Sequence, residues 1–484
     1  MTPKFVILWT DVVLLLLVLT LAWYVRHVRR SPNLRSTWGK VLADAPALCS
    51  AVVMAAFLVV TLLDSVHFRR ALPASATAMA GSAQAYDTRT ESLLDAALAG
   101  LRNSREASYS KPLAYLGFAK ESREVGGQTV RIFPRLAHGG AHLTDPEAQW
   151  LPDLALRSAA GAAGGLLVAA LAAWLTAALL ARQQGSSTGA AFQQIRRNET
   201  AIPWRAALFT VAAISVATGV VLALMNVYHV LGTDRTGNDV LLQATKSVRT
   251  AFVIGTLATL ATLPFAVVFG VAAGYFKGWV DEAIQYAYTT LSSVPNVLLI
   301  AACVLMLQVF IDKHPDFFET GAERSDLRIF MLCVILGVTG WASLCRLLRA
   351  ETMKLRELEF VQAATAFGVS HVRIMSRHIL PNLMHLVLIT TVLEFSGLIL
   401  YEAVLSYVGV GVDPSMNSFG GMINLARSEM SRDDVVWWSF AAAFGFMVTL
   451  VLAANLFADG VRDAFDPRAR VFRSRRKLTV KKAA

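Results

Sequence analysis

Charged residues are scarce in this chain. Only 16% of its 484 residues are Asp, Glu, Lys or Arg, whereas 55% are hydrophobic. Soluble globular domains are about a quarter charged, so this composition excludes an ordinary soluble protein and indicates an integral membrane protein. The formal net charge of +11 does not predict a nucleic-acid partner, because the Lys and Arg residues gather in short segments beside apolar runs.

Cysteine is scarce as well, and the four that occur lie in or at the edge of apolar runs: Cys49, Cys303, Cys333 and Cys345. None has a partner at metal-site spacing, so we expect small apolar side chains and no disulfide framework. His138 and His142 stand four residues apart in "HGGAH", but two glycines separate them and no third ligand is near in sequence. We predict an ordinary loop there and no metal site.

The motifs of common catalytic sites are missing too. The chain contains no GxxxxGK[ST], so it cannot cradle the phosphates of ATP in the usual glycine-rich loop. It also lacks a hydrolase-type nucleophile motif and paired carboxylates in a soluble context. We therefore expect that the chain is not an enzyme and holds no cofactor of its own.

Long hydrophobic runs, in contrast, are abundant. A membrane-spanning helix needs about 20 largely apolar residues. Nine runs meet this need, at roughly 7–25, 45–63, 159–181, 206–227, 251–275, 288–310, 329–348, 385–408 and 437–458. Asp11 interrupts the first run, and the basic segment "RHVRRSPNLR" follows that run, which favours an uncleaved helix over a signal peptide. We predict an all-α integral membrane protein with about nine transmembrane helices.

The basic loops predict the orientation of these spans. An excess of Lys and Arg after the first run, in the 182–205 linker, around 357–378 and in the tail places these segments in the cytoplasm. With nine spans, the N-terminus then lies outside and the C-terminus lies in the cytoplasm. The tail segment "RSRRKLTVKK" either fixes this orientation or also binds anionic membrane lipid.

The polar linker "ARQQGSSTGAAFQQIRRNET" divides the chain. Before it we predict two transmembrane helices in 1–63, a periplasmic insert in 64–158, and a third helix with a cytoplasmic linker in 159–200. After it we predict a six-span core in 201–470 and a basic cytoplasmic tail in 471–484. The insert has Gly- and Pro-containing turns but no strong period, so it is either a small folded lid or an extended loop.

The segment "FVQAATAFGVSHVRIMSRHILPNLM" lies between two spans and is too polar to cross a bilayer itself. Its apolar residues recur at helical spacing: Phe360, Ala363, Ala364 and Phe367. This spacing predicts a short amphipathic helix, which Gly368 can end in the left-handed conformation. Ser370 can cap a second helix that ends before Pro381. The pair lies either on lipid or against another protein, and its small alanines favour the second interpretation.

This segment resembles the EAA loop of ABC-importer permeases. The matching positions within 355–381 are Ala363, Ala364, Gly368, Leu380 and Pro381. Gln362 stands at the usual Glu, and His378 at the usual Ile. "HVLGTDRTGNDVLLQATKSVRTAFVIG", "YEAVLSYVGVGVDPSMNSFGGMI" and "LFADGVRDAFDPRAR" resemble three further motifs of the dipeptide, oligopeptide and nickel importer family, second-subunit type. Residues 1–200 have no counterpart in that pattern.

The resemblance implies a type I ABC-importer permease core that passes peptides or similar small solutes across the bacterial inner membrane. The implied partners are two ATP-binding subunits, a second and different permease subunit, and an external solute-binding protein. ATP would be bound by the partner. The implied ATPase-coupling residues are Phe360, Gln362, Ala363, Ala364, Phe367, Gly368, Leu380 and Pro381.

Four acidic residues are candidates for the translocation path or its gate. Asp234 and Asp239, in "GTDRTGND", predict a capped turn before a helix, and the resemblance places that turn beside the path. Glu394 and Glu402 lie inside the 385–408 span, where carboxylates are costly. Glu402 matches a family position, which favours packing or gating, while Glu394 either packs or contacts a peptide amine. A secondary transporter and a membrane receptor with an external sensing insert are the alternative functions.

Overall fold

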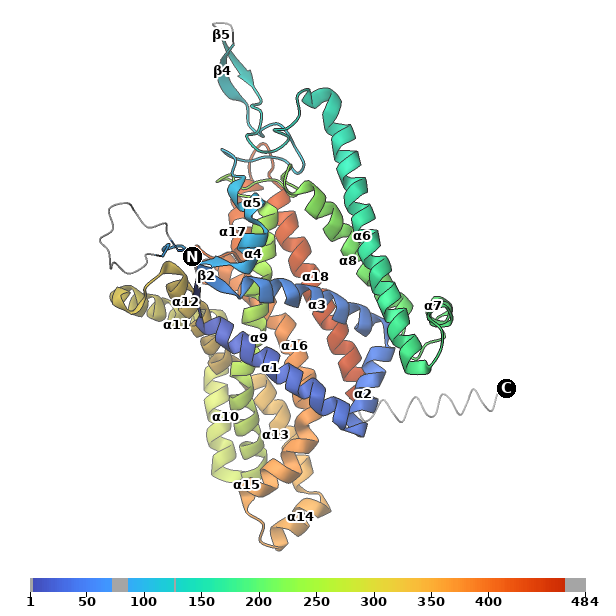
Figure 1. The fold of residues 1–484 in the computed structure, drawn as a ribbon. Coiled ribbons are helices and arrows are strands. Elements are labelled where there is room, and N and C mark those ends of the chain that lie inside the picture. Colours follow the sequence, from blue (N-terminus) through green and yellow to red (C-terminus); the bar gives the residue numbers. More distant parts are fainter. Residues whose placement is uncertain (1–2, 72–85, 126–127, 466–484) are drawn as a thin grey trace, which may run out of the picture. The chain divides into compact units, whose positions relative to one another are not determined.

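The computed structural model describes residues 3–71, 86–125 and 128–465 (Figure 1). The predicted tail at 471–484 therefore lies outside the described residues. Contacts divide the chain into two compact units. Unit 1 combines 1–6, 42–250 and 417–453, and unit 2 combines 7–41, 251–416 and 454–484. Each unit is thus assembled from three separate stretches of sequence.

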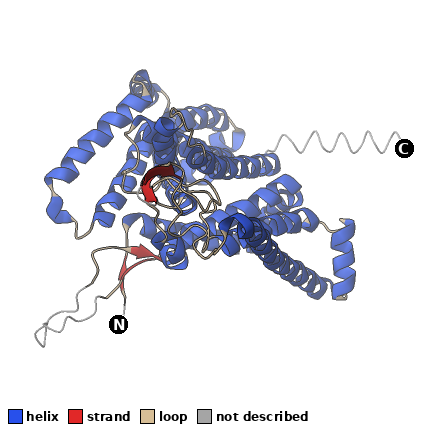
Figure 2. Cartoon of the chain, turned by 90° about the horizontal axis from the view of Figure 1, so that it is seen from above, coloured by secondary structure: helices blue, strands red, loops and turns tan. Residues whose placement is uncertain are grey.

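Helices dominate both units, as predicted (Figure 2). Among the described residues, eight helices are long and apolar enough to cross a membrane, and a bent pair raises the number to nine. The eight are α1 (Trp9–Arg30), α3 (Ala45–Asp64), α6 (Pro146–Gln184), α8 (Trp204–Leu224), α9 (Val240–Phe276), α11 (Asn296–Lys313), the continuous helix His371–Val408, and α18 (Trp438–Phe465). The bent pair is α12 (Gly321–Gly340) and α13 (Ala342–Arg356).

Shorter elements connect these spans. The short helices are α2 (Pro32–Ala43), α4 (Leu93–Ala97), α5 (Ala99–Asn103), α7 (Thr188–Arg197), α10 (Gly278–Ser293), α14 (Glu359–Ala366), α15 (His371–Ile374), α17 (Phe419–Glu429) and the 3-10 turn Pro315–Phe317. Two small antiparallel sheets were not predicted. One joins β1 (Lys4–Val6), β2 (His67–Arg69) and β3 (Glu91–Ser92), and the other is the hairpin of β4 (Glu121–Val125) and β5 (Gln128–Ile132).

Three predicted spans differ in detail from the helices. The run at 159–181 belongs to the 39-residue helix α6, which tolerates Pro152 near its start. The run at 288–310 crosses a break at Val294, because Pro295 disfavours helical backbone at the preceding residue. The run at 329–348 bends by 42° between α12 and α13, next to Gly340.

In unit 1, α6 and α8 approach each other at their backbones. A Cβ added to Gly161 would lie 2.4 Å from the carbonyl oxygen of Gly219, and one added to Gly165 would lie 2.4 Å from that of Ser215. Small residues four apart allow this separation, which suits a helix pair in lipid, where packing rather than water exclusion drives association. The additional helix α6 is therefore packed directly on α8.

In unit 2, a continuous apolar core joins α9, α10, α13, α14 and the start of the 371–408 helix. Its fully buried members include Ala266, Cys345, Leu348, Val361, Ile374, Ile379 and Leu383. Asp11, which interrupts the first apolar run, is buried in α1, and the neighbouring Thr10 donates hydrogen bonds to Asp326 of α12. Buried polar groups at this position are thus paired within the unit.

The prediction that a second helix ends before Pro381 is wrong. α15 continues through a π-helical turn, Met375–Ile379, into α16 (Leu380–Val408) without interruption. Pro381 lacks an N–H and would crowd a regular helix at the carbonyl four residues earlier. The wider π-turn Met375–Ile379 lies just before Pro381 and gives its ring the room that a regular α-helical turn lacks. α15 and the candidate span α16 are therefore one continuous helix.

Candidate functional site

The segment from α14 to α15, hereafter the elbow (359–374), reverses direction at Phe367 and Gly368. It lies below α10 and α13 in the view of Figure 1. Val361 and Ile374 anchor it, being 1% and 0% exposed in the core of unit 2. Phe367, in contrast, is 87% exposed. The elbow thus buries one face in its own unit and presents large apolar side chains on the other.

The structure divides the predicted coupling residues between these two faces. Phe360, Gln362, Ala363 and Phe367 are exposed, whereas Ala364 packs partly against the core. Leu380 is partly buried, and Pro381 lies exposed in the first turn of α16. The predicted apolar stripe is therefore mainly an outward-facing stripe.

Gly368 adopts a φ of +73°, as its predicted role requires. A Cβ at this position would meet nothing within 4 Å, so backbone conformation and not crowding selects glycine. Ser370 occupies the N-cap position of α15, but its side chain makes no capping hydrogen bond. Ser370 therefore has the predicted N-cap position but not the capping hydrogen bond, and Ile374 at the other end of α15 is buried in the core.

Polar contacts tie the elbow to the ends of neighbouring helices. The hydroxyl of Tyr275 in α9 lies 2.8 Å from Nδ1 of His371. Lys277 donates to Glu357 at 2.8 Å, which joins the end of α9 to the end of α13. Together with the buried anchors, the Tyr275–His371 contact attaches the elbow to the end of α9.

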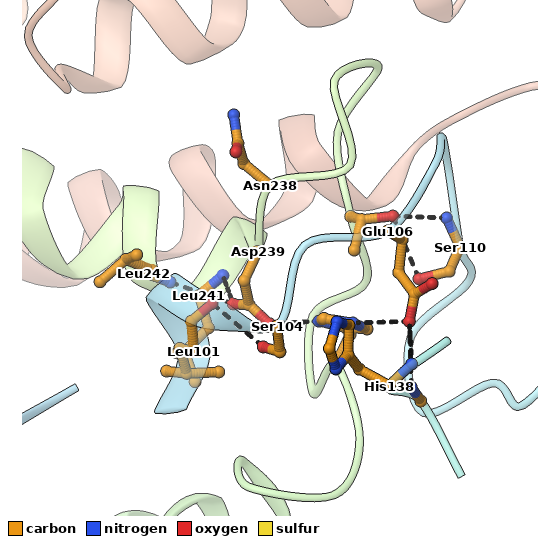
Figure 3. Close-up of polar contacts among 12 residues, drawn as sticks. Leu101, Ser104, Glu106, Ser110, His138, Asn238, Asp239, Leu241 and Leu242 are labelled. Carbon is orange, nitrogen blue, oxygen red and sulfur yellow. Dashed lines mark hydrogen bonds and ion pairs between the residues drawn. The ribbon is translucent and has the colours of Figure 1, made fainter. Parts of the chain in front are cut away.

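A second candidate site lies in unit 1, where the insert packs on the "HVLGTDRTGND" loop. Figure 3 shows Glu106 of the insert beside His138, and Asp239 beside the start of α9. The Glu106 carboxylate accepts hydrogen bonds from the amides of Ala137, His138 and Gly139 at 2.8–3.0 Å. His229 connects the two acids, at 3.4 Å from Glu106 and 2.8 Å from Asp239.

This buried network keeps its charges. Burial alone would raise the pKa of Glu106, but the hydrogen bonds from His229 and three backbone amides outweigh burial and lower it to about 2. Burial alone would lower the pKa of His229, but the hydrogen bonds to Asp239 and Glu106 outweigh burial and raise it to about 9. At neutral pH His229 is therefore protonated and Glu106 is ionised.

Asp234 and Asp239 form the capped turn that was predicted. Asp234 accepts from the amides of Thr236 and Asn238, at 2.8 and 2.9 Å. Asp239 accepts from the amides of Leu241 and Leu242, at 2.8 and 3.1 Å, and so caps α9.

Gly237, in the middle of this turn, is required by contact with the insert. It has a φ of +77°, and a Cβ there would lie 1.9 Å from the carbonyl oxygen of Glu106. The insert and the turn are thus fitted backbone to backbone. Sequence reasoning identified the turn from its motif, but Glu106 stands in no motif that could have indicated this role.

The two intramembrane glutamates have different surroundings. Glu402 is 1% exposed and accepts a hydrogen bond from Ser406 at 2.6 Å, one turn further along α16. Ser406 in turn accepts a hydrogen bond from the amide of Val412. Through Ser406, Glu402 thus stabilises the loop that follows α16. Glu394 is half-buried, and its carboxylate forms no hydrogen bond or ion pair with the described residues.

The histidines of "HGGAH" take part in protein contacts. The His138 amide donates to Glu106, and His142 lies 2.9 Å from Asp153 of α6. Within the described ranges, no three His, Cys, Asp or Glu side chains are grouped to hold a metal ion.

The comparisons with known proteins place the elbow inside a known family. The model of the binding-protein-dependent transport system inner membrane component matches residues 266–471. The oligopeptide transport system permease protein OppC of Mycobacterium tuberculosis is 31% identical over 245 residues, which make up 51% of this chain and 78% of that protein. The chain belongs to this family of permeases.

A second oligopeptide permease agrees with this membership. OppC of Haemophilus influenzae is 30% identical over 246 residues, covering 51% of this permease and 72% of that protein. A solved inward-facing structure of the MetNI methionine ABC transporter covers 46% of this permease and 93% of that chain, at 16% identity and a TM-score of 0.34. A likeness at that level carries no argument.

Membership decides between the functions left open by the sequence. The chain is a multi-pass inner-membrane permease component of an ABC importer and not a secondary transporter or a receptor. It works with an ATPase and an external binding protein, and as a permease it has no catalytic activity of its own. The family match begins at residue 266, so the insert and the His229 network lie before it.

Proposed function

We propose that this permease is the second-subunit type of a peptide importer and that the elbow docks on an ATP-binding subunit. Identity of 30–31% to oligopeptide permeases supports the peptide class. The observation that carries the docking role is the outward apolar face of the elbow, above all Phe367 at 87% exposure. Exposed aromatic side chains on a rigid support are typical anchors of protein interfaces.

The continuous helix from His371 to Val408 supplies a route for the movement. Closure of two ATP-binding subunits around ATP would displace the elbow, and α16 would move with it because no joint separates them. Val361 and Ile374 would carry the same displacement to α9 and α13 through the shared core. A rigid-body shift of this kind opens the path to one side of the membrane at a time.

The remaining parts of the importer follow from this assignment. The basic loops support a cytoplasmic elbow and C-terminus, an external N-terminus, and an external insert at 64–158. A second, different permease subunit would complete the path, and a solute-binding protein would deliver the peptide.

Among the path candidates, Glu394 is the carboxylate best suited to meet a peptide amine, because it has no partner among the described residues. The other three candidates accept hydrogen bonds within their own segments and would affect gating by stabilising those segments: Asp234, Asp239 and Glu402. An unchanged range of transported peptides in a Glu394→Gln variant would contradict the contact with substrate.

Gly368→Val tests the docking role. A β-branched residue cannot adopt a φ of +73° without strain, so the elbow should lose its shape and peptide uptake should fall at least about tenfold. Uptake of labelled peptides of graded length would be measured in cells that lack the native permease. Membrane abundance should stay normal, since a Cβ at this position meets no neighbour.

Gly185→Val is the matched control. Gly185 also ends a helix with positive φ, at +65°, and a Cβ there also meets nothing within 4 Å, but it lies in the linker after α6. This variant should keep uptake. Normal uptake and normal co-purification of the ATP-binding subunit with Gly368→Val would refute the docking role.

A further inference from the structure

A hollow of about 510 Å³ opens beside the elbow, within unit 2. Its lining includes Tyr275, Arg356, Glu357, Gln362, Thr365 and His371. These residues come from the end of α9, the end of α13, and both helices of the elbow. The hollow therefore lies next to the surface that is proposed above to meet an ATP-binding subunit.

Arg356 is the feature of this hollow that points to a ligand. Its guanidinium lies over the ring of Tyr275, 5.9 Å from the centroid, which fixes its position. Its Nη1 atom is buried and donates no hydrogen bond to any residue that the structure describes. Buried polar atoms nearly always have partners, and an unpaired charged donor is costly, so this atom indicates a missing acceptor.

The other groups in the hollow cannot supply that acceptor. The only carboxylate among the lining residues named above, Glu357, pairs with Lys277 at 2.8 Å. Gln362 is neutral, and its Nε2 donates to the backbone carbonyl of Glu357 at 3.2 Å. The Tyr275 hydroxyl is engaged with His371. Within the described part of the chain, the Glu357 carboxylate is thus hydrogen-bonded to Lys277, and Nη1 of Arg356 keeps no hydrogen-bond acceptor.

We propose that this hollow receives a carboxylate side chain, Asp or Glu, of the ATP-binding subunit and that Arg356 binds it. This inference rests on the proposed docking of the elbow. A planar guanidinium presents paired donors that match the two oxygens of a carboxylate, and the partly enclosed position strengthens the contact. Gln362, at a position where Glu is usual, keeps the hollow positive and available.

Capture of the ATP-binding subunit by the purified permease tests this proposal. The tagged permease would be co-expressed with its ATP-binding subunits, and the ratio of the two proteins would be measured after purification. Arg356→Gln should lower this ratio at least about tenfold, because the partner carboxylate then loses its counter-charge. Arg356→Lys keeps the charge but not the paired donors and should give an intermediate ratio.

Lys354→Gln is the matched control. Lys354 lies two residues earlier on α13, pairs with Glu351 at 2.9 Å, and does not line the hollow. Its loss removes the same charge from the same helix end and should leave the ratio within about twofold of the wild type, as expected for an exposed pair.

Gln362→Glu gives an independent test that does not alter Arg356. The new carboxylate would neutralise Arg356 within the chain and should lower capture several-fold. If Arg356→Gln reduces the amount of folded permease, this variant and Arg356→Lys decide the question. The proposal is overturned if the Arg356→Gln variant captures as much ATP-binding subunit as the wild type does, or if the Gln362→Glu variant captures more.

The outcomes separate this inference from the proposed function. If the wild-type permease captures no ATP-binding subunit, the docking of the elbow fails, and the carboxylate contact fails with it. If the wild type and all variants capture it equally, docking stands and only the role of Arg356 is lost.

Discussion

The elbow in unit 2 and the His229 network in unit 1 are built on opposite plans. The elbow exposes apolar side chains, and in the hollow beside it one buried guanidinium nitrogen, on Arg356 of α13, has no acceptor among the described residues. In the network, Glu106 and Asp239 each accept several hydrogen bonds, and His229 contacts both. The surface for which we propose a protein partner leaves groups unsatisfied, whereas the contact within the chain satisfies its own. Three predictions, from the largest effect on stability to the smallest, test this contrast.

Glu106→Gln should produce the largest loss of stability. It removes one charge from a buried, hydrogen-bonded set and turns an amide group toward three backbone N–H donors. Breaking a buried pair in this way costs about 3 kcal/mol or more of unfolding free energy. Thermal unfolding and amide hydrogen exchange of residues 227–240 would measure the effect.

Glu121→Gln, on the exposed strand β4, is the control for this change. It should leave both measurements unchanged. Equal protection of 227–240 in the two variants would mean that Glu106 does not hold the loop.

Raising the pH should weaken the same contact by a smaller amount. The pKa of His229 in the folded protein is about 9, above its usual 6.5, so protonation stabilises the fold. This stabilisation is complete below pH about 6.5 and is lost as the pH rises through 9, a loss on the order of 3 kcal/mol. Glu106 has a lowered pKa of about 2, so its contribution is lost only in acid, below pH about 4.5.

Hydrogen exchange of 227–240, corrected for the intrinsic pH dependence of exchange, would detect this loss between pH 7 and 10. His229→Gln cannot titrate and should show a flat profile over that interval. A flat profile in the wild-type protein as well would contradict a charged His229.

Phe367→Ala should have the smallest effect on stability and yet a large effect on capture of the ATP-binding subunit. Because Phe367 is 87% exposed, its removal should change the unfolding free energy by less than about 0.5 kcal/mol. Loss of an interface anchor should nevertheless lower capture of the ATP-binding subunit about tenfold. Val361→Ala, at a position 1% exposed, should instead cost about 1–3 kcal/mol of stability. Unimpaired capture by Phe367→Ala would remove this residue from the interface.

The same contrast explains what could be predicted from sequence. The spans and the elbow follow from local patterns: apolar runs of sufficient length, a stripe at helical spacing, and a glycine with positive φ at position 368. The network depends on pairs such as Glu106 and His229, which are 123 residues apart and share no period or motif. His229 and Asp239 stand in the "HVLGTDRTGND" motif, but no sequence pattern near them indicates that Glu106 is their partner.

The sequence also misled at Pro381 for a physical reason. A proline preceded by a helical segment usually marks the end of that segment, because the residue before it avoids helical backbone. Here the π-turn Met375–Ile379 absorbs the conflict, and such a turn has no reliable sequence signature. The prediction was right that the segments on both sides of the proline are helical, but wrong that they are separate helices.

The π-turn Met375–Ile379 also determines how the side chains of α15 are rotated about the helix axis relative to those of α16. One extra residue in a helical turn rotates all following side chains about the helix axis by roughly 100°, the rotation per residue of an α-helix. The direction in which α15 faces, relative to Glu394 and Glu402 further along α16, is therefore governed by a single insertion. Deleting one residue between 375 and 379 would rotate α15 and the rest of the elbow about the helix axis relative to Glu394 and Glu402.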